Sequence, residues 1–500
     1  MSNGVKGPIS FFNTLTRKVE FLRPIKKTAV GLYTCGPTVY NYAHLGNLRT
    51  YVFEDLLERT LAYLGYKVNR VMNITDVGHL TSDGDVGEDK LEREAKSEAK
   101  SVKEIASFYT KAFFEDMKKL NVKMPKTIAP ASKYVPDQVK IIKTLVEKGF
   151  AYDTSEAVYF DTSRLKDYGK LSGQKLAEKT VGARAEVVTK TSKRHPTDFV
   201  LWFKLVGKFE HHLLRWDSPW GVGFPGWHIE CSAISRKFLG QPFDIHTGGV
   251  DHIGTHHTNE IAQSEAAFGK PLANIWLHGE FLLIETAKMA KSESNFITVK
   301  DLERQHVPAA AFRYLALTAH YRSPLHFSWS ALDQARQALT ALIGRALYAE
   351  FMSHAKDLPR STKLTASRPP KGGDPAIVVL REKFRAALVN DLNVPQALAV
   401  VHELVGNKAL ATRDPKGVLT ALYDFDEVLG LRLKTYVRHY RMSELMKDKR
   451  LRTILAEREE FRRLQQFIQS DSLRKKLAGL GYITEDTPIG PYAAPKLISL

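Results

Sequence analysis

Residues Val30-Gly-Leu-Tyr-Thr34 and the helical pattern that follows them over 44–64 decide the fold. The five residues predict a short buried strand, and Gly36 directly after them predicts a turn. Within 44–64, apolar residues recur at intervals of three and four, as on one face of a helix, and Gly65 is placed to end it. Lys67–Ile74 alternates as a second strand. A strand–helix–strand unit of this kind is typical of a parallel, doubly wound sheet.

Predicted strands and helices continue to about residue 300, but the segment between the two parts of the sheet has a different pattern. Residues 80–105 are charged and predict a loop and a surface helix, whereas 150–225 contain short strand-like runs that predict an insertion between two halves of the sheet. The second half resumes near Phe243, with a helix over 255–268 and a strand over Asn274–Ile284. The prediction is an α/β, Rossmann-like, doubly wound parallel-sheet catalytic domain.

We expect this catalytic domain to span residues 1–330, with its insertion at about 120–225. From about 300 onward the pattern is almost entirely helical, so 331–500 predicts a mainly α-helical C-terminal region. The stretch 354–375 is rich in Ser, Thr, Lys, Pro and Gly and predicts a linker inside that region.

Composition narrows the class of protein. The 500 residues carry a formal net charge of +18, and 331–500 alone contain 28 Lys+Arg against 19 Asp+Glu. A basic excess of this size favours a polyanionic partner, with nucleic acid first. The N-terminus lacks the pattern of a secretory signal, and no run of about 18 apolar residues predicts a membrane span. Only two cysteines occur, which suits a reducing compartment, and we expect a cytoplasmic protein.

Both cysteines lie in dense motifs that predict a zinc site. Cys35 follows the first strand, Cys231 lies in Pro225-Gly-Trp-His-Ile-Glu-Cys231, and His256 and Glu260 are spaced to share a helix face. Two thiolates, an imidazole and a carboxylate are a plausible zinc set. His257 is an alternative to His256, because the spacing from Glu260 favours His256 only weakly.

Two further motifs predict a nucleotide site. The helix start at His44-Leu-Gly-Asn47 offers backbone N–H groups, and His44 and Asn47 can both donate to phosphate oxygens. Gly46 would let an adenine or ribose approach the backbone. Lys288 and Lys291 flank a small-residue loop and could neutralise the β- and γ-phosphates as pyrophosphate leaves. Each motif alone is weak; their order in one chain is much more specific.

A zinc ion beside a nucleotide site would be useful to an enzyme whose substrate is a thiol. A shape-based pocket separates cysteine from serine poorly, whereas zinc–sulfur coordination holds the thiolate selectively. The combination points towards an enzyme that activates cysteine with ATP.

The motifs resemble those of the cysteinyl-tRNA synthetases, a family of class I aminoacyl-tRNA synthetases. The resemblance covers essentially the whole chain. It is carried by Thr34-Cys-Gly-Pro-Thr-Val-Tyr40, the HIGH-type His44-Leu-Gly-Asn47, Asn73-Ile-Thr-Asp76, Gly226-Trp-His-Ile-Glu-Cys231, His256-His-Thr-Asn-Glu260, the KMSKS-type Lys288-Met-Ala-Lys-Ser292 and Asn390-Asp-Leu-Asn-Val-Pro395.

The resemblance implies ligation of L-cysteine to tRNA(Cys) with MgATP, by a protein that is expected to be a monomer with one Zn²⁺ per chain. It implies these roles: zinc ligands Cys35, Cys231, His256 and Glu260; cysteine pocket Gly36, Thr38, Thr75, Trp227 and His246; ATP site His44, Gly46, Asn47 and Lys291; catalysis His44, Asn47, Lys288 and Lys291. The region after about 330 resembles the anticodon-binding part of the family.

The sequence departs from the family pattern at a few positions, and two other functions stay open. Asn47, Ala290, Phe224 and Thr258 differ from the residues common in the motifs. One alternative is a cysteine ligase of the same core that acts on an amino sugar, against which the basic helical region argues. The other is a zinc-stapled RNA-binding protein without catalysis, which the paired phosphate motifs disfavour.

Overall fold

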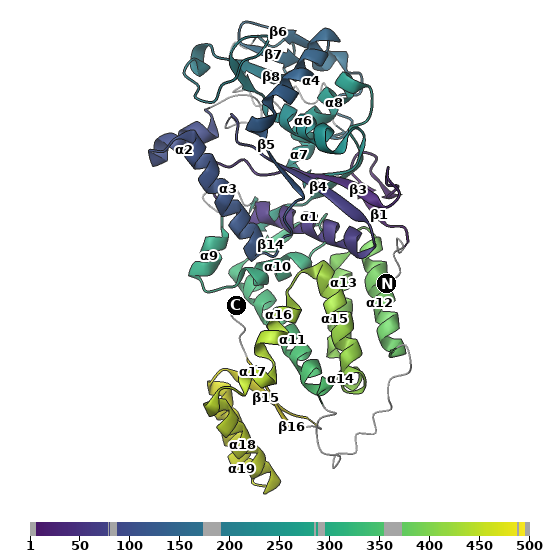
Figure 1. Ribbon diagram of the computed structural model, residues 1–500, viewed down its shortest axis with the longest axis vertical. Helices are drawn as coiled ribbons and strands as arrows, with labels where there is room; N and C mark the ends of the chain where they lie inside the picture. Colours follow the sequence, from purple (N-terminus) through teal and green to yellow (C-terminus); the bar gives the residue numbers. More distant parts are fainter. Residues whose placement is uncertain are drawn as a thin grey trace. The chain divides into compact units, whose positions relative to one another are not determined.

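The computed structural model describes residues 7–78, 80, 88–173, 192–284, 287–288, 296–354, 373–487 and 490–495 (Figure 1). The chain divides into two compact units. The first contains Met1–Thr298 and Tyr321–Leu325, and the second contains Val299–His320 and His326–Leu500. Each unit is described by itself.

A five-stranded parallel sheet forms the centre of the first unit, with strand order β11-β10-β3-β4-β5. Its strands are β3 (Ala29–Thr34), β4 (Lys67–Ile74), β5 (Thr127–Pro130), β10 (Phe243–Gly249) and β11 (Ala273–Gly279). The predicted Rossmann-like class is confirmed. The strand order reverses between β3 and β10, and ligands of doubly wound sheets bind at such a reversal, beyond the carboxyl ends of the strands.

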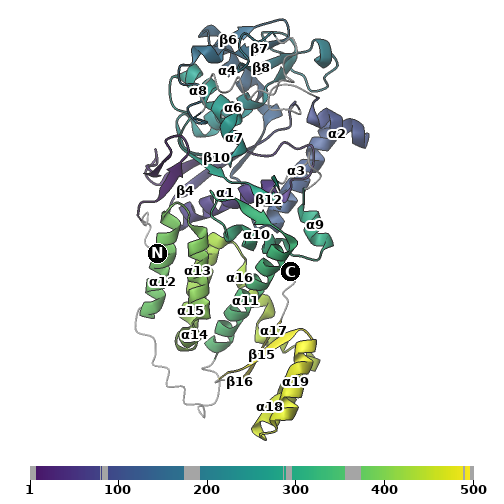
Figure 2. The ribbon, with the colours of Figure 1, turned by 180° about the vertical axis from the view of Figure 1, so that it is seen from behind.

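Helices cover both faces of this sheet. α1 (Leu45–Tyr63) lies on one side, and α6 (Trp227–Leu239) and α8 (His256–Phe268) lie on the other (Figures 1 and 2). His44 caps α1, because its Nδ1 accepts the backbone N–H of Asn47 at 3.1 Å. Gly65 follows the C-cap with φ +95°, a conformation that suits glycine, so the predicted helix end is confirmed.

A second, antiparallel sheet of four strands lies between β5 and α6 in the chain, in the order β6-β7-β8-β9. Its strands are β6 (Ala151–Asp153), β7 (Ala157–Phe160), β8 (Phe199–Lys204) and β9 (Gly223–Pro225). The range expected for the insertion therefore holds both β5 of the parallel sheet and this second sheet. The helices nearby are α2 (Lys90–Glu98), α3 (Val102–Lys119), α4 (Val135–Glu147), α7 (Asp251–Gly254), η1 (Ala131–Tyr134), η2 (Thr162–Arg164) and η4 (Gly207–Phe209).

The prediction of one strand over Asn274–Ile284 is wrong, because the chain bends between β11 and β12 (Leu282–Ile284). The buried Arg49 guanidinium donates to the carbonyls of Glu280 at 2.7 Å and Phe281 at 2.5 Å, and also to Ser323. A side chain from α1 thereby bonds both carbonyls of the bend, and the Phe281 carbonyl also accepts the N–H of Leu325 at 3.0 Å. β13 (Ala287–Lys288) pairs with β12.

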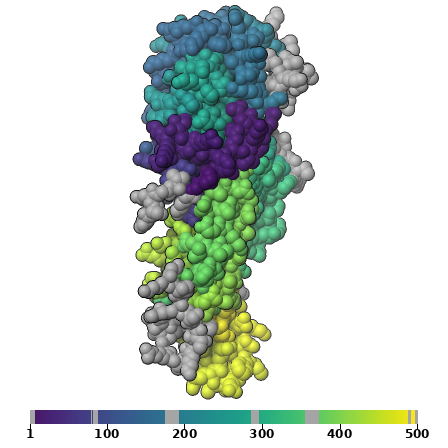
Figure 3. All heavy atoms as spheres, turned by 90° about the vertical axis from the view of Figure 1, so that its right-hand side faces the viewer, coloured from purple at the N-terminus to yellow at the C-terminus, as the bar shows by residue number. Residues whose placement is uncertain are grey.

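An N-terminal hairpin of β1 (Ser10–Asn13) and β2 (Lys18–Phe21) is attached to the edge of β11. The Asn13 amide donates to the carbonyl of Asn274 at 3.0 Å and accepts the N–H of Trp276 at 3.0 Å. Thr14 N–H donates to the carbonyl of Trp276 at 2.9 Å. Figure 3 shows the N-terminal residues, in purple, at the surface against other segments of the first unit.

The second unit is mainly helical, and it ends in a hairpin of two antiparallel strands. Its elements are α9 (Val299–Arg304), α10 (Ala309–Leu317), α11 (Trp329–Ser353), α12 (Pro375–Val389), α13 (Val394–Gly406), α14 (Lys408–Arg413), α15 (Pro415–Leu429), α16 (Leu433–Tyr440), α17 (Met442–Leu445), α18 (Lys449–Arg463), α19 (Phe467–Gly479), β15 (Tyr482–Thr487) and β16 (Gly490–Pro495); β14 (Leu325–Phe327) includes residues of both units. Most of the expected linker, 355–372, lies outside the described residues. Among the helices that the structure describes, none is long and apolar enough to cross a membrane.

A buried histidine ties the loop before β9 to the start of α2. His212 stacks on Phe224 with ring centroids 3.9 Å apart, and its Nε2 lies 3.4 Å from Asp89 and 3.5 Å from Glu92. Burial lowers the pKa of His212, but the hydrogen bond to Asp89 and the charge of Glu92 outweigh burial and raise it above 6.5.

This contact predicts a pH-dependent contribution to stability. A histidine whose pKa is higher in the folded state stabilises the fold below its unfolded value of about 6.5, and that contribution is lost as pH rises through the folded pKa. Denaturant unfolding between pH 5.5 and 8.5 should therefore show a loss of stability in the wild type that is smaller in His212→Gln, which still donates to Asp89. Equal pH slopes in both proteins would contradict the assignment.

Candidate functional site

Four ligand-type side chains meet where the strand order of the parallel sheet reverses. Cys35 directly follows β3, Cys231 lies in α6, and His256 and Glu260 lie one turn apart at the start of α8. All four are buried, and their ligand atoms lie within 4.8 Å of one another. The two sulfur atoms are 4.0 Å apart, and His256 Nε2 is 3.0 Å from Glu260 Oε1. The structure thus brings together the four residues that the sequence predicts as zinc ligands.

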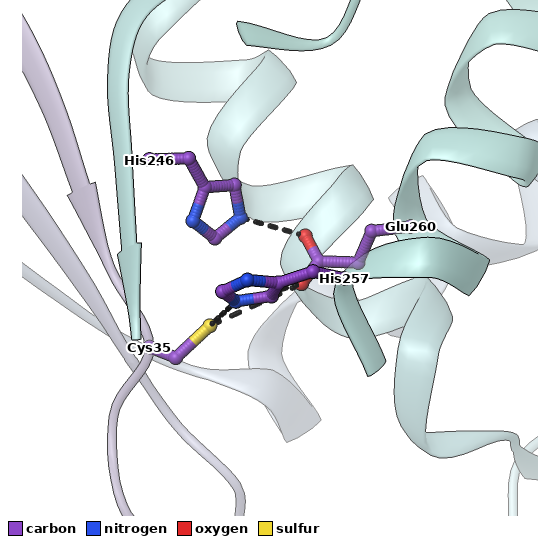
Figure 4. A group of neighbouring side chains, drawn as sticks. All are labelled: Cys35, His246, His257 and Glu260. Carbon is purple, nitrogen blue, oxygen red and sulfur yellow. Dashed lines mark hydrogen bonds and ion pairs between the residues drawn. The ribbon is translucent and has the colours of Figure 1, made fainter. Parts of the chain in front are cut away.

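A second set of four shares two of these residues and adds His246 and His257 (Figure 4). His257 Nε2 lies 3.3 Å from Cys35 Sγ, and His246 Nε2 lies 3.0 Å from Glu260 Oε2. His257 is farther from Glu260 than His256 is, with 3.8 Å between His257 Nε2 and Oε1. On these distances alone, His257 remains an alternative to His256 as a metal ligand.

The register of the sheet explains why aromatic and imidazole rings gather here. Tyr33, His246 and Trp276 lie opposite one another on β3, β10 and β11. The His246 ring stacks on Trp276 with centroids 4.4 Å apart and meets Tyr33 edge-on at 5.2 Å. Gly248 leaves room for the neighbouring helices, because a Cβ there would lie 2.7 Å from the His257 ring. The wall of the site is therefore set by strand pairing.

The charges of the cluster are strongly coupled. Burial and Cys231 raise the pKa of Cys35, whereas the hydrogen bond from Cys35 and the charge of His256 lower the pKa of Cys231 to about 6 in spite of burial. His246 and His256 likewise overcome burial and lower the pKa of Glu260 to about 2, and Glu260 raises that of His256 to about 10. The directions of these shifts favour the charged forms of Cys231, Glu260 and His256 together.

This donor set fits a zinc ion. Zinc is bound by thiolate, imidazole and carboxylate groups, usually four at a time, and all three types are present among the four residues of this buried cluster. Binding of a dication would replace the imidazolium proton as the counter-charge for the two anions, and it would release the proton of Cys35. A buried anionic pair of this kind is costly without such a partner.

The turn after β3 approaches β4 very closely at Gly36. Its N–H donates to Asn73 Oδ1 at 2.8 Å, and a Cβ on Gly36 would lie 1.7 Å from the Asn73 carbonyl oxygen. Asn73 also donates to Thr75 Oγ1 at 3.2 Å, and that hydroxyl donates to Glu230 Oε2 at 2.8 Å. Gly36 and Thr75 are thus joined through one asparagine, beside the cluster.

The other predicted pocket residues lie around the same site. Thr38 forms an isolated parallel bridge with Thr75. Trp227, half-buried at the start of α6, lies over His256 with ring centroids 4.2 Å apart. His246 contacts Glu260 as described above. All five residues predicted for the cysteine pocket therefore lie on segments that adjoin the four-donor cluster.

The predicted nucleotide turn lies at the N-terminus of α1. His44 is buried, Gly46 is half-buried and Asn47 is exposed. The backbone of residues 297–298 pairs with this turn, because Leu45 N–H donates to the Ile297 carbonyl at 2.7 Å and His44 bridges Thr298. Lys291 lies outside the described residues, and for Lys288 only the backbone, in β13, is described.

Three polar residues near the cluster were missed by sequence reasoning. His228 Nδ1 lies 3.0 Å from Nδ1 of His256, His278 Nε2 lies 2.8 Å from Nδ1 of His257, and Thr14 Oγ1 lies 2.8 Å from the other nitrogen of His278. A signal existed for His278, since it is two residues from Trp276 on β11 and shares its face. Thr14 had none, because it is brought there by the docking of the N-terminal hairpin.

Comparisons with known proteins give matches over nearly the whole chain. A family model described as the catalytic domain of class I (C) tRNA synthetases matches residues 21–337, and a DALR domain model matches 383–434. A cysteine–tRNA ligase of Treponema denticola is 42% identical over 493 residues, covering 96% of this chain and 98% of that protein. Cysteine–tRNA ligase 1 of Burkholderia lata is 44% identical over 485 residues, covering 97% and 96%.

A solved structure shares the fold at low sequence identity. The Mycobacterium tuberculosis methionyl-tRNA synthetase, solved in complex with methionyl-adenylate, matches 82% of this chain and 91% of its own, with a TM-score of 0.57 and 13% identity. The family model covers more than half of the chain, and the relatives are similar over nearly all of it. The chain belongs to the cysteine–tRNA ligases, a family of class I aminoacyl-tRNA synthetases.

Proposed function

We propose that this protein activates L-cysteine with MgATP and transfers it to the 3′ end of tRNA(Cys), and that a zinc ion held by Cys35, Cys231, His256 and Glu260 selects the substrate. The observation that carries the proposal is the buried cluster of these four residues, with ligand atoms within 4.8 Å of one another. Its position at the strand reversal of a doubly wound sheet, where ligands bind, supports it.

Selection of cysteine over serine would rest on the metal and on the pocket around it. When bound, zinc holds a substrate thiol as thiolate, an interaction that a serine hydroxyl matches poorly. We assign the pocket to Gly36, Thr38, Thr75, Trp227 and His246. The Gly36 turn is bonded to β4 through Asn73, and Trp227 lies over the His256 ring, so these contacts position both segments beside the ligands.

In the first step, a carboxylate oxygen of cysteine attacks the α-phosphorus of ATP, and the bond to the β-phosphate oxygen breaks to release pyrophosphate. The N-terminus of α1 offers backbone N–H groups to the phosphates, and Gly46 allows close approach. His44 and Asn47 would donate to phosphate oxygens. Since His44 Nδ1 accepts the Asn47 N–H, a neutral His44 carries its proton on Nε2 and donates from that atom.

Lys288 and Lys291 would neutralise the charge that develops on the leaving pyrophosphate. The hydrogen bond from Leu45 to Ile297 supports this assignment, because it ties the chain six residues after Lys291 to the start of α1. In the second step, a hydroxyl of the terminal ribose of the tRNA attacks the carbonyl carbon of the adenylate, and AMP leaves.

The acceptor is tRNA(Cys), which the net charge of +18 and the basic helical region support. We further assign the protein to the cytoplasm, as a monomer. The test is charging of a tRNA(Cys) transcript with radiolabelled cysteine in the presence of MgATP. Acid-precipitable cysteine that depends on ATP and is absent with a tRNA(Ser) transcript supports the proposal. Cysteine-dependent ATP–pyrophosphate exchange without charging would overturn it in favour of a small amino-sugar acceptor.

A further inference from the structure

A chain of three polar contacts runs from the metal cluster to the N-terminal hairpin. Cys35 Sγ lies 3.3 Å from Nε2 of His257, Nδ1 of His257 lies 2.8 Å from Nε2 of His278, and Nδ1 of His278 lies 2.8 Å from Thr14 Oγ1. Figure 4 shows the first of these contacts. Both histidines are buried, with exposed fractions of 0% and 3%.

The far end of this chain is held firmly in place. Thr14 is joined to β11 through its own N–H, which donates to the Trp276 carbonyl at 2.9 Å. Asn13, next to it, exchanges two hydrogen bonds with the backbone of β11, at Asn274 and Trp276. The Thr14 hydroxyl therefore has a constant position relative to His278, two residues farther along the same strand.

The hydrogen bonds of such a chain can be donated in either of two directions. Burial disfavours the charged form of an imidazole, and a neutral imidazole has one donor nitrogen and one acceptor nitrogen. If Thr14 donates, His278 and His257 each pass a hydrogen bond on, and His257 Nε2–H points at the Cys35 sulfur. If the chain runs the other way, Nε2 of His257 carries a lone pair and could itself bind the metal.

Two observations favour the first direction. Cys35, Cys231, His256 and Glu260 already provide four donors, including both thiolates, and the substrate thiol would be the fifth, which leaves no position for another imidazole on a zinc ion. In addition, His256 Nε2 is 3.0 Å from Glu260 Oε1, whereas His257 Nε2 is 3.8 Å from it. A thiolate in this position would accept the hydrogen bond that His257 offers, and such outer partners orient metal ligands.

We propose that Thr14, His278 and His257 form a hydrogen-bond relay that donates to the Cys35 thiolate and holds it in place as a zinc ligand. The three are positioning residues, and His257 is not itself a ligand. The inference rests on the proposed zinc set. It assigns the N-terminal hairpin, which contains none of the family motifs, a part in building the metal centre.

The test uses matched variants of the full chain and two readouts other than activity. Zinc affinity is measured by competition with a chromophoric chelator, and the Co²⁺-substituted protein is measured by absorption spectroscopy. Thr14→Val removes the hydroxyl at constant shape and should weaken zinc binding about tenfold, as loss of outer-shell partners typically does. Thr14→Ser, which keeps the hydroxyl, and Thr16→Val, at an exposed position in the same hairpin, should stay near wild type.

Variants of His257 separate a donor from a ligand. His257→Gln retains an N–H group near the position of Nε2, so it should keep the ligand-field bands of bound Co²⁺ and most of the affinity. His257→Ala should weaken zinc binding more than Thr14→Val, with the thiolate-to-cobalt charge-transfer bands still indicating two thiolates.

Two results would overturn the relay while zinc binding by the wild type stands. They are wild-type affinity in Thr14→Val, or a change of ligand-field bands in His257→Gln that marks the loss of a nitrogen ligand. A wild-type protein that binds neither ion would instead overturn the proposed function, together with the relay that rests on it.

Discussion

Replacing Cys231 with serine is expected to abolish zinc-dependent cysteine activation. Serine is nearly isosteric, but its hydroxyl does not ionise near neutral pH and is a poor zinc ligand, so one of the two thiolates of the cluster is lost. We expect zinc affinity to fall by about a thousandfold or more, equivalent to about 4 kcal/mol, and cysteine-dependent ATP–pyrophosphate exchange to fall in parallel. Chelator competition and exchange assays measure the two quantities.

A serine of the same helix provides the control. Ser235 is also fully buried in α6, one turn beyond Cys231, and its hydroxyl contacts only the backbone of Ser232 in the contacts described for it. Ser235→Ala should therefore leave zinc affinity within about twofold, since it removes one local hydrogen bond. A Cys231→Ser protein that binds zinc as tightly as Ser235→Ala would show that Cys231 is not a ligand.

The second large effect is expected at a residue with no functional group. Gly36→Ala would place a Cβ 1.7 Å from the carbonyl oxygen of Asn73, and backbone atoms cannot move aside as a flexible side chain can. The turn that carries Cys35 must therefore shift by more than 1 Å. We expect exchange activity to fall about 100-fold, the effect of a displacement of that size in an active site, and stability to fall by about 1–3 kcal/mol.

A second glycine separates this effect from the general consequence of an added methyl group. Gly344 lies inside helix α11, and a Cβ there would meet no atom within 4 Å. Gly344→Ala should keep full activity and gain about 0.5–1 kcal/mol of stability, because alanine is the better helix former. Thermal unfolding and exchange assays on both variants provide the comparison. Unchanged activity in Gly36→Ala would contradict the close approach of the turn after β3 to β4.

Local patterns predict the core of the fold well, because there the pattern and the packing agree. β4 has the predicted bounds, Lys67–Ile74, and α1 begins and ends within one residue of the predicted 44–64. The break between β11 and β12 could not be predicted in the same way. It depends on Arg49, which is more than 230 residues earlier in the chain and satisfies the carbonyls of the bend.

The residues of the candidate site also differ in whether the sequence alone predicts them. Cys35 and Cys231 are the only two cysteines of the chain, and His256 and Glu260 form a spaced pair within a motif, so residue chemistry points to this set, and the structure brings the four together. Positioning residues carry no such mark. His228 is recognised only when α6 is packed beside α8, and Thr14 only when the hairpin docks, whereas for His278 the spacing from Trp276 along β11 is the one signal in the sequence. The choice between His256 and His257 likewise depends on hydrogen-bond direction, which spacing does not encode.

The central claim is that a metal, and not the shape of the pocket, selects cysteine. The most direct measurement is ATP–pyrophosphate exchange with cysteine and with serine, on protein as purified, after strong chelation, and after zinc is restored. The account predicts exchange with cysteine alone, its loss on chelation and its recovery with zinc. Exchange with cysteine that persists in folded protein shown to be free of metal would contradict it.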